Sequence, residues 1–368
     1  MSARAGASGL VTRRVGLACN ELIRARYVDA VDLARLEAAA VFSYHAFAVP
    51  SEQGRVRRDA AAEAELAAFA ADLDVLLVCE GAPFVGESVL AAAPRLGLLG
   101  ELEGDRFAYR LDLAAAHARS IVVVDTSHGS SWPTAEWALA LALIGLRNAG
   151  ALFRRMIAHE ETYLPAEERS GPGYERAELS GKRVGMVGFG HVARRLVQLL
   201  EPFTVEVRVY DPYAPRELAD PCNVDFGPLE VVLESDVVFV LVPQTPATEG
   251  LIGRAELELL APGTVLVNVS RGKVIDTEAL LTRLHHGDIV ACLDVFDPEP
   301  LPLDSPLADL ANVFVSPHVA GVTEESRRRF FSLMVDDCLR HFAGLEPRGA
   351  LTAAVVALRH SSLASRTP

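Results

Sequence analysis

Residues 184–196 read "VGMVGFGHVARRL", which is an apolar run, a glycine-rich turn and the start of a helical pattern. Gly188 permits a tight turn, Gly190 lets backbone amides approach a pyrophosphate, and Ala193 keeps the helix close to the sheet. The phosphates would rest on the N-terminus of the helix, where free N–H groups and the helix dipole favour anions. The stretch predicts the strand, turn and helix of a dinucleotide-binding unit.

The next apolar run strengthens this prediction. "VEVRVYDP" (205–212) places Asp211 at its end, about twenty residues beyond the second glycine, where a carboxylate accepts hydrogen bonds from the ribose diol of NAD. The competing interpretation is a glycine-rich turn beside an unrelated surface Asp. Strand, spacing and acid together favour NAD, and they favour it over NADP, whose 2′-phosphate the carboxylate would repel.

Short apolar runs alternate with amphipathic segments on both sides of this unit. The alternation predicts an α/β protein whose parallel sheets are covered by helices on both faces. In the first part of the chain we expect strands at 14–19, 39–47, 74–80, 96–101 and 120–126, with helices at 60–73, 86–94 and 111–119.

A second α/β unit is expected from Lys182 onward. Before it, Pro133 can begin a long helix over 133–161, and the segment 163–181, rich in Pro, Gly and charge, is expected to be a loop. We expect a last long helix from Thr323. The strands of the second unit are predicted at 183–189, 205–211, 236–243, 264–270, 288–296 and 312–318.

Composition limits the classes of function. The net charge of −14 over 368 residues argues against nucleic acid, whose binding needs a basic face. The longest apolar run, "WALALALIGL" (137–146), is too short to span a bilayer, so no membrane association is expected. Five scattered cysteines without a CxxC pair indicate a reducing compartment, here the cytoplasm, and no metal site. Residues 1–14, a segment with basic but no acidic residues, are expected to be a short overhang before the first strand.

Four polar residues fall where strands of the second unit should end. Arg271 follows "VLVNVS", Asp294 ends the next strand, Glu299 lies in the loop after it, and His318 follows the last strand. Open parallel sheets bind ligands at that edge. Each residue alone has a structural explanation, such as a solvated strand end or a turn. Their coincidence beside a dinucleotide turn predicts an active site.

These motifs resemble those of the D-isomer-specific 2-hydroxyacid dehydrogenases. The similarity covers roughly residues 133–325, and its last three motifs are specific. The matching stretches are "GKRVGMVGFGHVAR" (181–194), "VPQTPATEGLI" (242–252), "VLVNVSRGKVIDTEAL" (265–280), "ACLDVFDPEPLP" (291–302) and "VSPHVAG" (315–321).

The resemblance implies two doubly wound parallel-sheet domains linked by two crossing helices. A Rossmann-type NAD-binding domain, residues 131–322, would be inserted into a flavodoxin-like substrate domain made of residues 1–130 and 323–347. Residues 348–368 would form a flexible tail. The family is usually dimeric through the helix that corresponds to 133–150, so a homodimer is expected.

The resemblance also implies that Arg271, Glu299 and His318 are the catalytic residues of an NAD-dependent D-2-hydroxyacid dehydrogenase. The planar guanidinium of Arg271 would bind the substrate carboxylate bidentately and polarise the adjacent carbonyl. Protonated His318 would donate to the carbonyl oxygen as hydride arrives from the reduced nicotinamide, and would accept the hydroxyl proton in the reverse direction. Glu299 would orient the imidazole and stabilise its charged form.

Further cofactor and substrate contacts are implied in the same way, with Asp294 near the nicotinamide. The cofactor would contact Gly188, Phe189, Gly190, His191, Val192, Asp211, Val242, Pro243, Thr248, Val269, Ser270, Arg271, Asp294, His318 and Gly321. The substrate would contact Gly81, Arg106, His128 and Arg271.

One loop departs from the family pattern. Where the family has a Gly-rich loop that holds the substrate carboxylate, residues 100–113 read "GELEGDRFAYRLDL". The carboxylates of Glu101, Glu103 and Asp105 would repel a substrate anion unless they point to solvent or pair with Arg106 or Arg110. We therefore expect a substrate other than plain pyruvate or glyoxylate, or else a loop that has drifted and an enzyme of low selectivity.

Two other functions stay open. The family includes transcriptional corepressors that keep the fold and the catalytic residues, so a dinucleotide-sensing binding protein is an alternative. A phosphite-type dehydrogenase is another. The family's formate enzymes place Gln before the active-site His, whereas this chain has Ser316-Pro317-His318, which disfavours formate.

Overall fold

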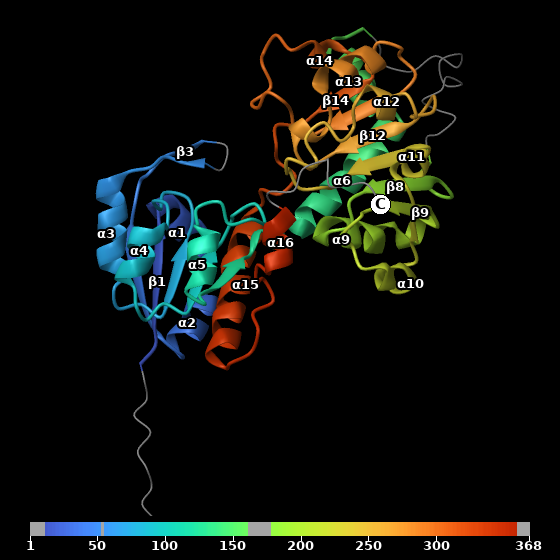
Figure 1. Ribbon diagram of the computed structural model, residues 1–368. Coiled ribbons are helices and arrows are strands. Elements are labelled where there is room, and N and C mark those ends of the chain that lie inside the picture. The colour runs from blue at the N-terminus through green and yellow to red at the C-terminus, as the bar shows by residue number, and fades with distance from the viewer. Residues whose placement is uncertain (1–11, 53–54, 161–177, 359–368) are drawn as a thin grey trace, which may run out of the picture. The chain divides into compact units, whose positions relative to one another are not determined.

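The computed structural model describes residues 12–52, 55–160 and 178–358. The chain divides into two compact units, and each is described by itself (Figure 1). Unit 1 extends to Gly129 and resumes with Arg327–Val356, while unit 2 contains Ser130–Ser326.

Unit 1 is built on a five-stranded parallel sheet with the strand order β2-β1-β5-β6-β7. This is the flavodoxin-like doubly wound order, and the predicted α/β fold is confirmed. The strands are β1 (Arg14–Cys19), β2 (Val41–Ala46), β5 (Val75–Val78), β6 (Leu98–Glu101) and β7 (Val122–Asp125). Outside this sheet, β3 (Ser51–Glu52) pairs antiparallel with β4 (Arg55–Val56).

Helices cover both faces of this sheet, because residues such as Val75–Val78 are apolar and buried on each side. One face packs against α3 (Ala60–Ala70), α4 (Glu87–Ala92) and α5 (Leu113–Ala118). The other packs against α1 (Glu21–Tyr27), α2 (Ala30–Glu37) and α15 (Glu324–Phe342). Figure 1 shows α15, in red, beside the blue and cyan elements from the opposite end of the chain.

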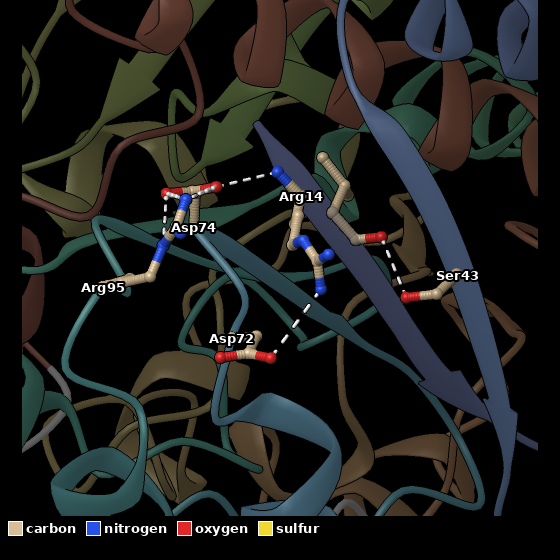
Figure 2. Close-up of polar contacts among 6 residues, drawn as sticks. Arg14, Ser43, Asp72, Asp74 and Arg95 are labelled. Atoms are coloured by element: carbon tan, nitrogen blue, oxygen red, sulfur yellow. Dashed lines mark hydrogen bonds and ion pairs between the residues drawn. The ribbon is translucent and has the colours of Figure 1, made fainter. Parts of the chain in front are cut away.

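An ionic cluster fastens the amino-terminal edge of the sheet in unit 1. Figure 2 shows Asp74 accepting hydrogen bonds from the backbone amide of Arg14 at 2.7 Å and from Nη2 of Arg95 at 2.9 and 3.0 Å. The Arg14 side chain lies 3.7 Å from Asp72, and the Ser43 hydroxyl donates to the Val15 carbonyl. These contacts lie at the edge opposite the carboxyl ends of the strands, so we assign them to stability.

Unit 2 contains a seven-stranded parallel sheet in the order β10-β9-β8-β11-β12-β13-β14. This is the Rossmann order with one more strand at the end. The strands are β8 (Arg183–Val187), β9 (Glu206–Tyr210), β10 (Asp225–Phe226), β11 (Val237–Val240), β12 (Val265–Asn268), β13 (Val290–Leu293) and β14 (Val313–Val315).

Alternate residues of these strands face different helices. Val265 and Val267 pack with α6 (Ser131–Leu146) and α9 (His191–Leu200). Leu266 packs with α11 (Leu229–Leu233), α12 (Arg254–Leu257) and α13 (Thr277–Leu284). Short elements complete the unit: α10 (Ala219–Cys222) and α14 (Pro306–Asp309).

The long helix predicted at 133–161 is two helices. α6 ends at Leu146 and α7 spans Ala149–Ile157, because Asn148 adopts a left-handed conformation with φ 43°. Asn tolerates that conformation better than most residues. No single helix within the described ranges is long and apolar enough to cross a bilayer; only the bent pair Ser127–Leu146 and Ala149–Ile157 meets that criterion when the two are taken together.

The tail predicted from residue 348 begins too early. The carboxylate of Asp337 accepts hydrogen bonds from the amides of Arg348 (2.7 Å) and Gly349 (2.8 Å), Leu351 is buried, and α16 spans Ala353–Leu358. A buried acceptor, which the sequence pattern does not reveal, keeps this segment ordered. Residues 1–11 of the predicted overhang, residue 161 of the predicted helix, residues 163–177 of the predicted loop and the last ten residues lie outside the described residues.

Candidate functional site

The predicted site residues of unit 2 gather along one edge of its sheet. Because all the strands are parallel, their carboxyl ends lie side by side. The glycine turn and its acid therefore lie at one end of this edge, and the predicted catalytic residues lie at the other. In strand order the edge carries Asp211 after β9, Gly188 after β8, Val242 after β11, Arg271 after β12, Asp294 after β13 and His318 after β14.

The turn after β8 has the geometry of a phosphate-binding turn. Gly188 has φ +101°, and a Cβ there would lie 2.8 Å from Val242 Cγ1, so the position requires glycine. Gly190 is the N-cap of α9, and no side chain caps that end. The N-terminus of α9, which begins with His191 and Val192, is therefore the kind of helix end whose N–H groups and dipole favour an anion.

Asp211 holds the glycine turn in place. Its Oδ2 accepts a hydrogen bond from the amide of Phe189 at 2.8 Å, and its Oδ1 accepts from the amides of Tyr213 (2.8 Å) and Ala214 (3.0 Å). A carboxylate offers about four lone-pair positions. Asp211 therefore makes structural contacts at the position where the sequence predicts a ribose ligand.

Two other predicted cofactor positions shape the backbone. The hydroxyl of Thr248 donates to the carbonyl of Pro243 at 2.6 Å and accepts from the amide of Thr245 at 2.8 Å, which closes the turn after β11. A Cβ at Gly321 would lie 3.2 Å from Ser130 Cβ, so the chain after His318 packs tightly on the start of α6.

Asn268, which the sequence analysis did not select, shapes the turn that carries Arg271. Its Nδ2 donates to the Arg271 carbonyl at 3.1 Å, and its Oδ1 accepts from the amide and hydroxyl of Ser270 at 3.0 and 2.8 Å. Val269 and Ser270 are buried. The available signal was an amide side chain at the end of an otherwise apolar strand.

Gly272 brings the Arg271 turn against the loop that carries Glu299. A Cβ at Gly272 would lie 1.9 Å from the carbonyl of Phe296, so any other residue would push the two segments apart. Arg271 is near enough to Glu299 for its charge to lower the pKa of that carboxyl.

Glu299 and His318 form a direct pair. Nδ1 of His318 hydrogen bonds Oε1 of Glu299, and the side chains are 40% and 31% exposed. Burial would raise the pKa of Glu299, but the hydrogen bond and charge of His318, the backbone of Phe296 and the charge of Arg271 hold it below its ordinary value. An ionised Glu299 only accepts, so Nδ1 carries the proton and Nε2 is left for a substrate.

Asp294, predicted to lie near the nicotinamide, forms several hydrogen bonds to neighbouring residues of the protein that were not predicted. It is fully buried, and its carboxylate accepts hydrogen bonds from the Ser316 hydroxyl and from the amides of Val319 and Ala320. These residues flank His318. Ser316 was not selected from the sequence, although its place beside Pro317-His318 was a signal.

Three of the predicted substrate contacts belong to unit 1. Gly81 is buried with φ +93°, and a Cβ there would lie 2.6 Å from the carbonyl of Phe47. Arg106 is exposed with φ 71°, and its amide donates to the Ser127 hydroxyl. His128 lies in the short helix Ser127–Ser130 after β7 and is partly exposed.

The acidic loop after β6 is held from inside unit 1. Glu101 is 1% exposed and faces Arg110, which is 7% exposed; Arg110 Nε lies 3.1 Å from Glu101 Oε1, an ion pair without hydrogen-bond alignment. Glu101 also accepts from the Arg110 amide at 3.1 Å. The expected pairing with Arg110 is thus observed for Glu101. Glu103 instead accepts from the Tyr27 hydroxyl at 2.5 Å.

The same loop contains three non-glycine residues at positive φ: Asp105, Arg106 and Ala108. Asp125 supports it by accepting hydrogen bonds from the amides of Ala108 (2.9 Å) and Ser127 (2.8 Å). Burial raises the pKa of Asp125 to about 6 against these hydrogen bonds. Buried carboxylates therefore impose conformations that glycine would adopt without strain.

The amino-acid sequence is similar to those of known dehydrogenases. Residues 139–320 match the sequence model of the D-isomer specific 2-hydroxyacid dehydrogenase, NAD binding domain. The chain is 31% identical over 269 residues to a D-3-phosphoglycerate dehydrogenase of Archaeoglobus fulgidus, covering 73% of this chain and 49% of that protein. It therefore spans about half the length of that relative.

A second relative is matched over most of its length. The chain is 31% identical over 291 residues to a glyoxylate reductase of Korarchaeum cryptofilum, covering 78% of this chain and 85% of that protein. Among solved structures, the NAD complexed form of a D-isomer specific 2-hydroxyacid dehydrogenase from Lactobacillus delbrueckii ssp. bulgaricus has a TM-score of 0.72 at 20% identity, covering 92% of this chain and all of that one. At that identity, the likeness concerns the fold.

Proposed function

Because the chain belongs to the D-isomer-specific 2-hydroxyacid dehydrogenase family, whose NAD-binding domain it contains, we propose that it interconverts a D-2-hydroxy acid and the corresponding 2-oxo acid. The observation that carries the proposal is the assembly at one sheet edge of Arg271, the Glu299–His318 pair and the glycine turn. Each supplies a different part of the required chemistry.

The residues present fit NAD. Gly188, where a Cβ would clash with Val242, allows the tight turn before α9, and the N-terminus of α9, which no side chain caps, would hold the pyrophosphate. Asp211 would bind the adenosine ribose. When bound in its reduced form, NAD supplies the hydride for the carbonyl carbon.

The chain's own residues bind and protonate the substrate. Arg271 would hold the carboxylate with its two-pronged guanidinium and draw electron density from the neighbouring carbonyl. His318, with Nδ1 directed to Glu299, would transfer its Nε2 proton to the carbonyl oxygen as the negative charge develops. In the reverse direction the same nitrogen takes the hydroxyl proton. Glu299 orients the ring and balances its positive charge.

A substrate panel tests the proposed reaction. Purified protein is mixed with NADH and with pyruvate, glyoxylate, hydroxypyruvate, longer-chain, phospho- or amino-bearing 2-oxo acids, and absorbance at the NADH band is followed. Turnover of at least one, absent in His318→Ala, is expected. NADH binding without turnover of any would instead support a dinucleotide-sensing protein.

The substrate class is proposed from unit 1. Since Glu101 is paired with Arg110 inside the unit, its charge does not repel a substrate anion. Arg106 places a positive charge at the surface of the same loop, which favours a substrate longer or more anionic than pyruvate or glyoxylate. Equal efficiency on pyruvate and on phospho-bearing acids, unchanged in Arg106→Ala, would contradict this.

We also propose a homodimer that works in the cytoplasm. All five cysteines are unpaired, as expected in a reducing compartment. On α7, Phe153, Met156 and Ile157 are 62%, 56% and 60% exposed. Their spacing places them on one face of the helix, which a second copy would cover.

A further inference from the structure

A chain of hydrogen bonds surrounds the backbone of His318. Asp294, at the end of β13, has 0% exposure. Its carboxylate accepts from the Ser316 hydroxyl at 2.5 Å and from the amides of Val319 (3.0 Å) and Ala320 (2.9 Å). Its carbonyl accepts from the His318 amide at 2.9 Å. The contacts therefore hold the chain on both sides of His318.

Trp137 extends this chain from α6. Its indole Nε1 donates to the Ser316 hydroxyl oxygen at 3.1 Å. An indole only donates, an ionised carboxylate only accepts, and a hydroxyl has one proton. The direction is therefore fixed: Trp137 donates to Ser316, which must point its proton at Asp294. Without the indole donor the hydroxyl could rotate away.

The backbone of His318 needs such support. His318 has φ +52°, in the left-handed region that residues with a side chain seldom adopt. Such conformations persist only where the surrounding structure imposes them. The direction in which the imidazole leaves the backbone, and hence the approach of Nδ1 to Glu299, depends on this conformation.

We propose that Trp137 and Ser316 are positioning residues for His318, which act through the buried carboxylate of Asp294 without touching substrate or cofactor. The kinetic part of this proposal rests on the proposed function. The structural part, that the chain keeps the turn at 316–320 closed, does not.

The kinetic test uses Trp137→Phe, Ser316→Ala, Ser316→Thr and the double variant Trp137→Phe/Ser316→Ala. With the 2-oxo acid that the wild type reduces fastest, kcat should fall about tenfold in the first two, or about 1.4 kcal/mol in the barrier. KM, and the Kd of NADH from its fluorescence, should stay within about twofold. Ser316→Thr keeps the hydroxyl and should retain kcat.

If Trp137 and Ser316 act through one series of hydrogen bonds, the effects of their substitutions on kcat should not be additive. The double variant should be no slower than Ser316→Ala alone, because removing the hydroxyl already disconnects the indole. Trp132→Phe is the matched control, since Trp132, the other tryptophan, packs under Arg195 at 4.1 Å and not on Ser316. It should keep the wild-type kcat.

The structural test is hydrogen–deuterium exchange at the amides of Val319 and Ala320 in the protein without added NADH. Exchange should be about tenfold faster in Trp137→Phe and Ser316→Ala, and unchanged in Trp132→Phe and Ser316→Thr. Additive losses of kcat, an equal loss in Trp132→Phe, or unchanged exchange would overturn the proposal. If the wild type reduces no 2-oxo acid, the proposed function fails, and the exchange result alone decides between support and rejection of the positioning role.

Discussion

Single residues at the sheet edge of unit 2 combine a structural contact with a proposed chemical role. Asp211 fastens the glycine turn through the Phe189 amide and also carries the charge expected beside the ribose. Glu299 both orients and balances His318. Since a drastic substitution would change geometry and charge together, conservative substitutions are the informative ones.

Arg271→Lys should weaken substrate binding and turnover while leaving the Kd of NADH nearly unchanged. A lysine keeps the charge but loses the planar fork, and each charged hydrogen bond contributes about 1.5–3 kcal/mol. The kcat/KM of the best 2-oxo acid should fall at least tenfold. Lys273→Ala, at an exposed cation in the same turn, should leave it unchanged. Loss of NADH binding in Arg271→Lys would assign this arginine to the cofactor or to structure.

Glu299→Gln should move the pH profile of reduction to lower pH. His318 lowers the pKa of Glu299 through its hydrogen bond and its charge, so an ionised Glu299 faces the ring and attracts the proton that the imidazole would donate. Reduction needs that proton and slows as rising pH removes it. Without the carboxylate, the decline should therefore begin at lower pH. Asp297→Asn, in the same loop, serves as the control, and identical profiles for Glu299→Gln and the wild type would reject the pair.

Asp211→Asn should narrow the preference for NAD over NADP. The amide oxygen can still accept from the backbone amides of Tyr213 and Ala214, but the charge that would repel a 2′-phosphate is gone. Arg216 does not replace it as a phosphate ligand in this structure, because its guanidinium lies over the Phe226 ring at 4.7 Å. The ratio of kcat/KM with the two cofactors measures the effect, with Glu217→Gln as the control. A wild type that uses both cofactors equally would contradict the expectation.

At the scale of elements, the most unusual segment is the loop between β6 and α5. Three non-glycine residues have positive φ there. The buried carboxylates of Glu101 and Asp125 accept hydrogen bonds from backbone amides of the loop. A buried ion pair is costly to break on one side, because a charge is then left without compensation.

Arg110→Met should therefore destabilise the protein by about 3–5 kcal/mol. The double variant Glu101→Leu/Arg110→Met should recover much of this loss, because no unpaired charge remains. Urea unfolding of both variants checks the cycle. Arg119→Met breaks an ion pair with Glu87 whose side chains are 32% and 65% exposed, and should cost less than about 1 kcal/mol. Equal losses in Arg110→Met and the double variant would contradict a structural pair.

At the scale of the whole molecule, two parallel sheets with different strand orders are built from one chain that leaves unit 1 at Gly129 and returns at Arg327. Both sheets are covered by helices on each face, so the apolar residues left at the surface are informative. α7 carries three of them on one face.

Met156→Glu should convert the proposed dimer into a monomer. A carboxylate in the middle of an apolar interface would lose its water without gaining a partner. Light scattering after size-exclusion chromatography gives the mass directly. Leu22→Glu, at another exposed apolar residue with 56% exposure, should leave the dimer intact. A monomeric wild-type protein would contradict the proposed homodimer.

Most strands and helices, and the residues expected at the sheet edge of unit 2, could be predicted from local patterns along the chain. The run before Gly188, the acid at Asp211 and the polar residues after β12 and β14 were readable because a strand, its turn and the next helix follow one another along the chain. Parallel strands end at one edge, so these residues were also expected to meet there. The helix break at Asn148 was not readable, because α7 continues the helical pattern beyond it.

The pairing of the buried polar groups becomes visible only in the folded chain. The hydrogen-bonded residues Trp137 and Ser316 are 179 residues apart in sequence, and Asp294 and Ala320 are 26 apart. Glu101 accepts a hydrogen bond from the amide of Arg110, nine residues further along the chain. Asp337 orders residues 348–349 although their sequence indicates a tail. A buried donor or acceptor must find a partner wherever packing provides one, and local composition carries no record of which distant residue that will be.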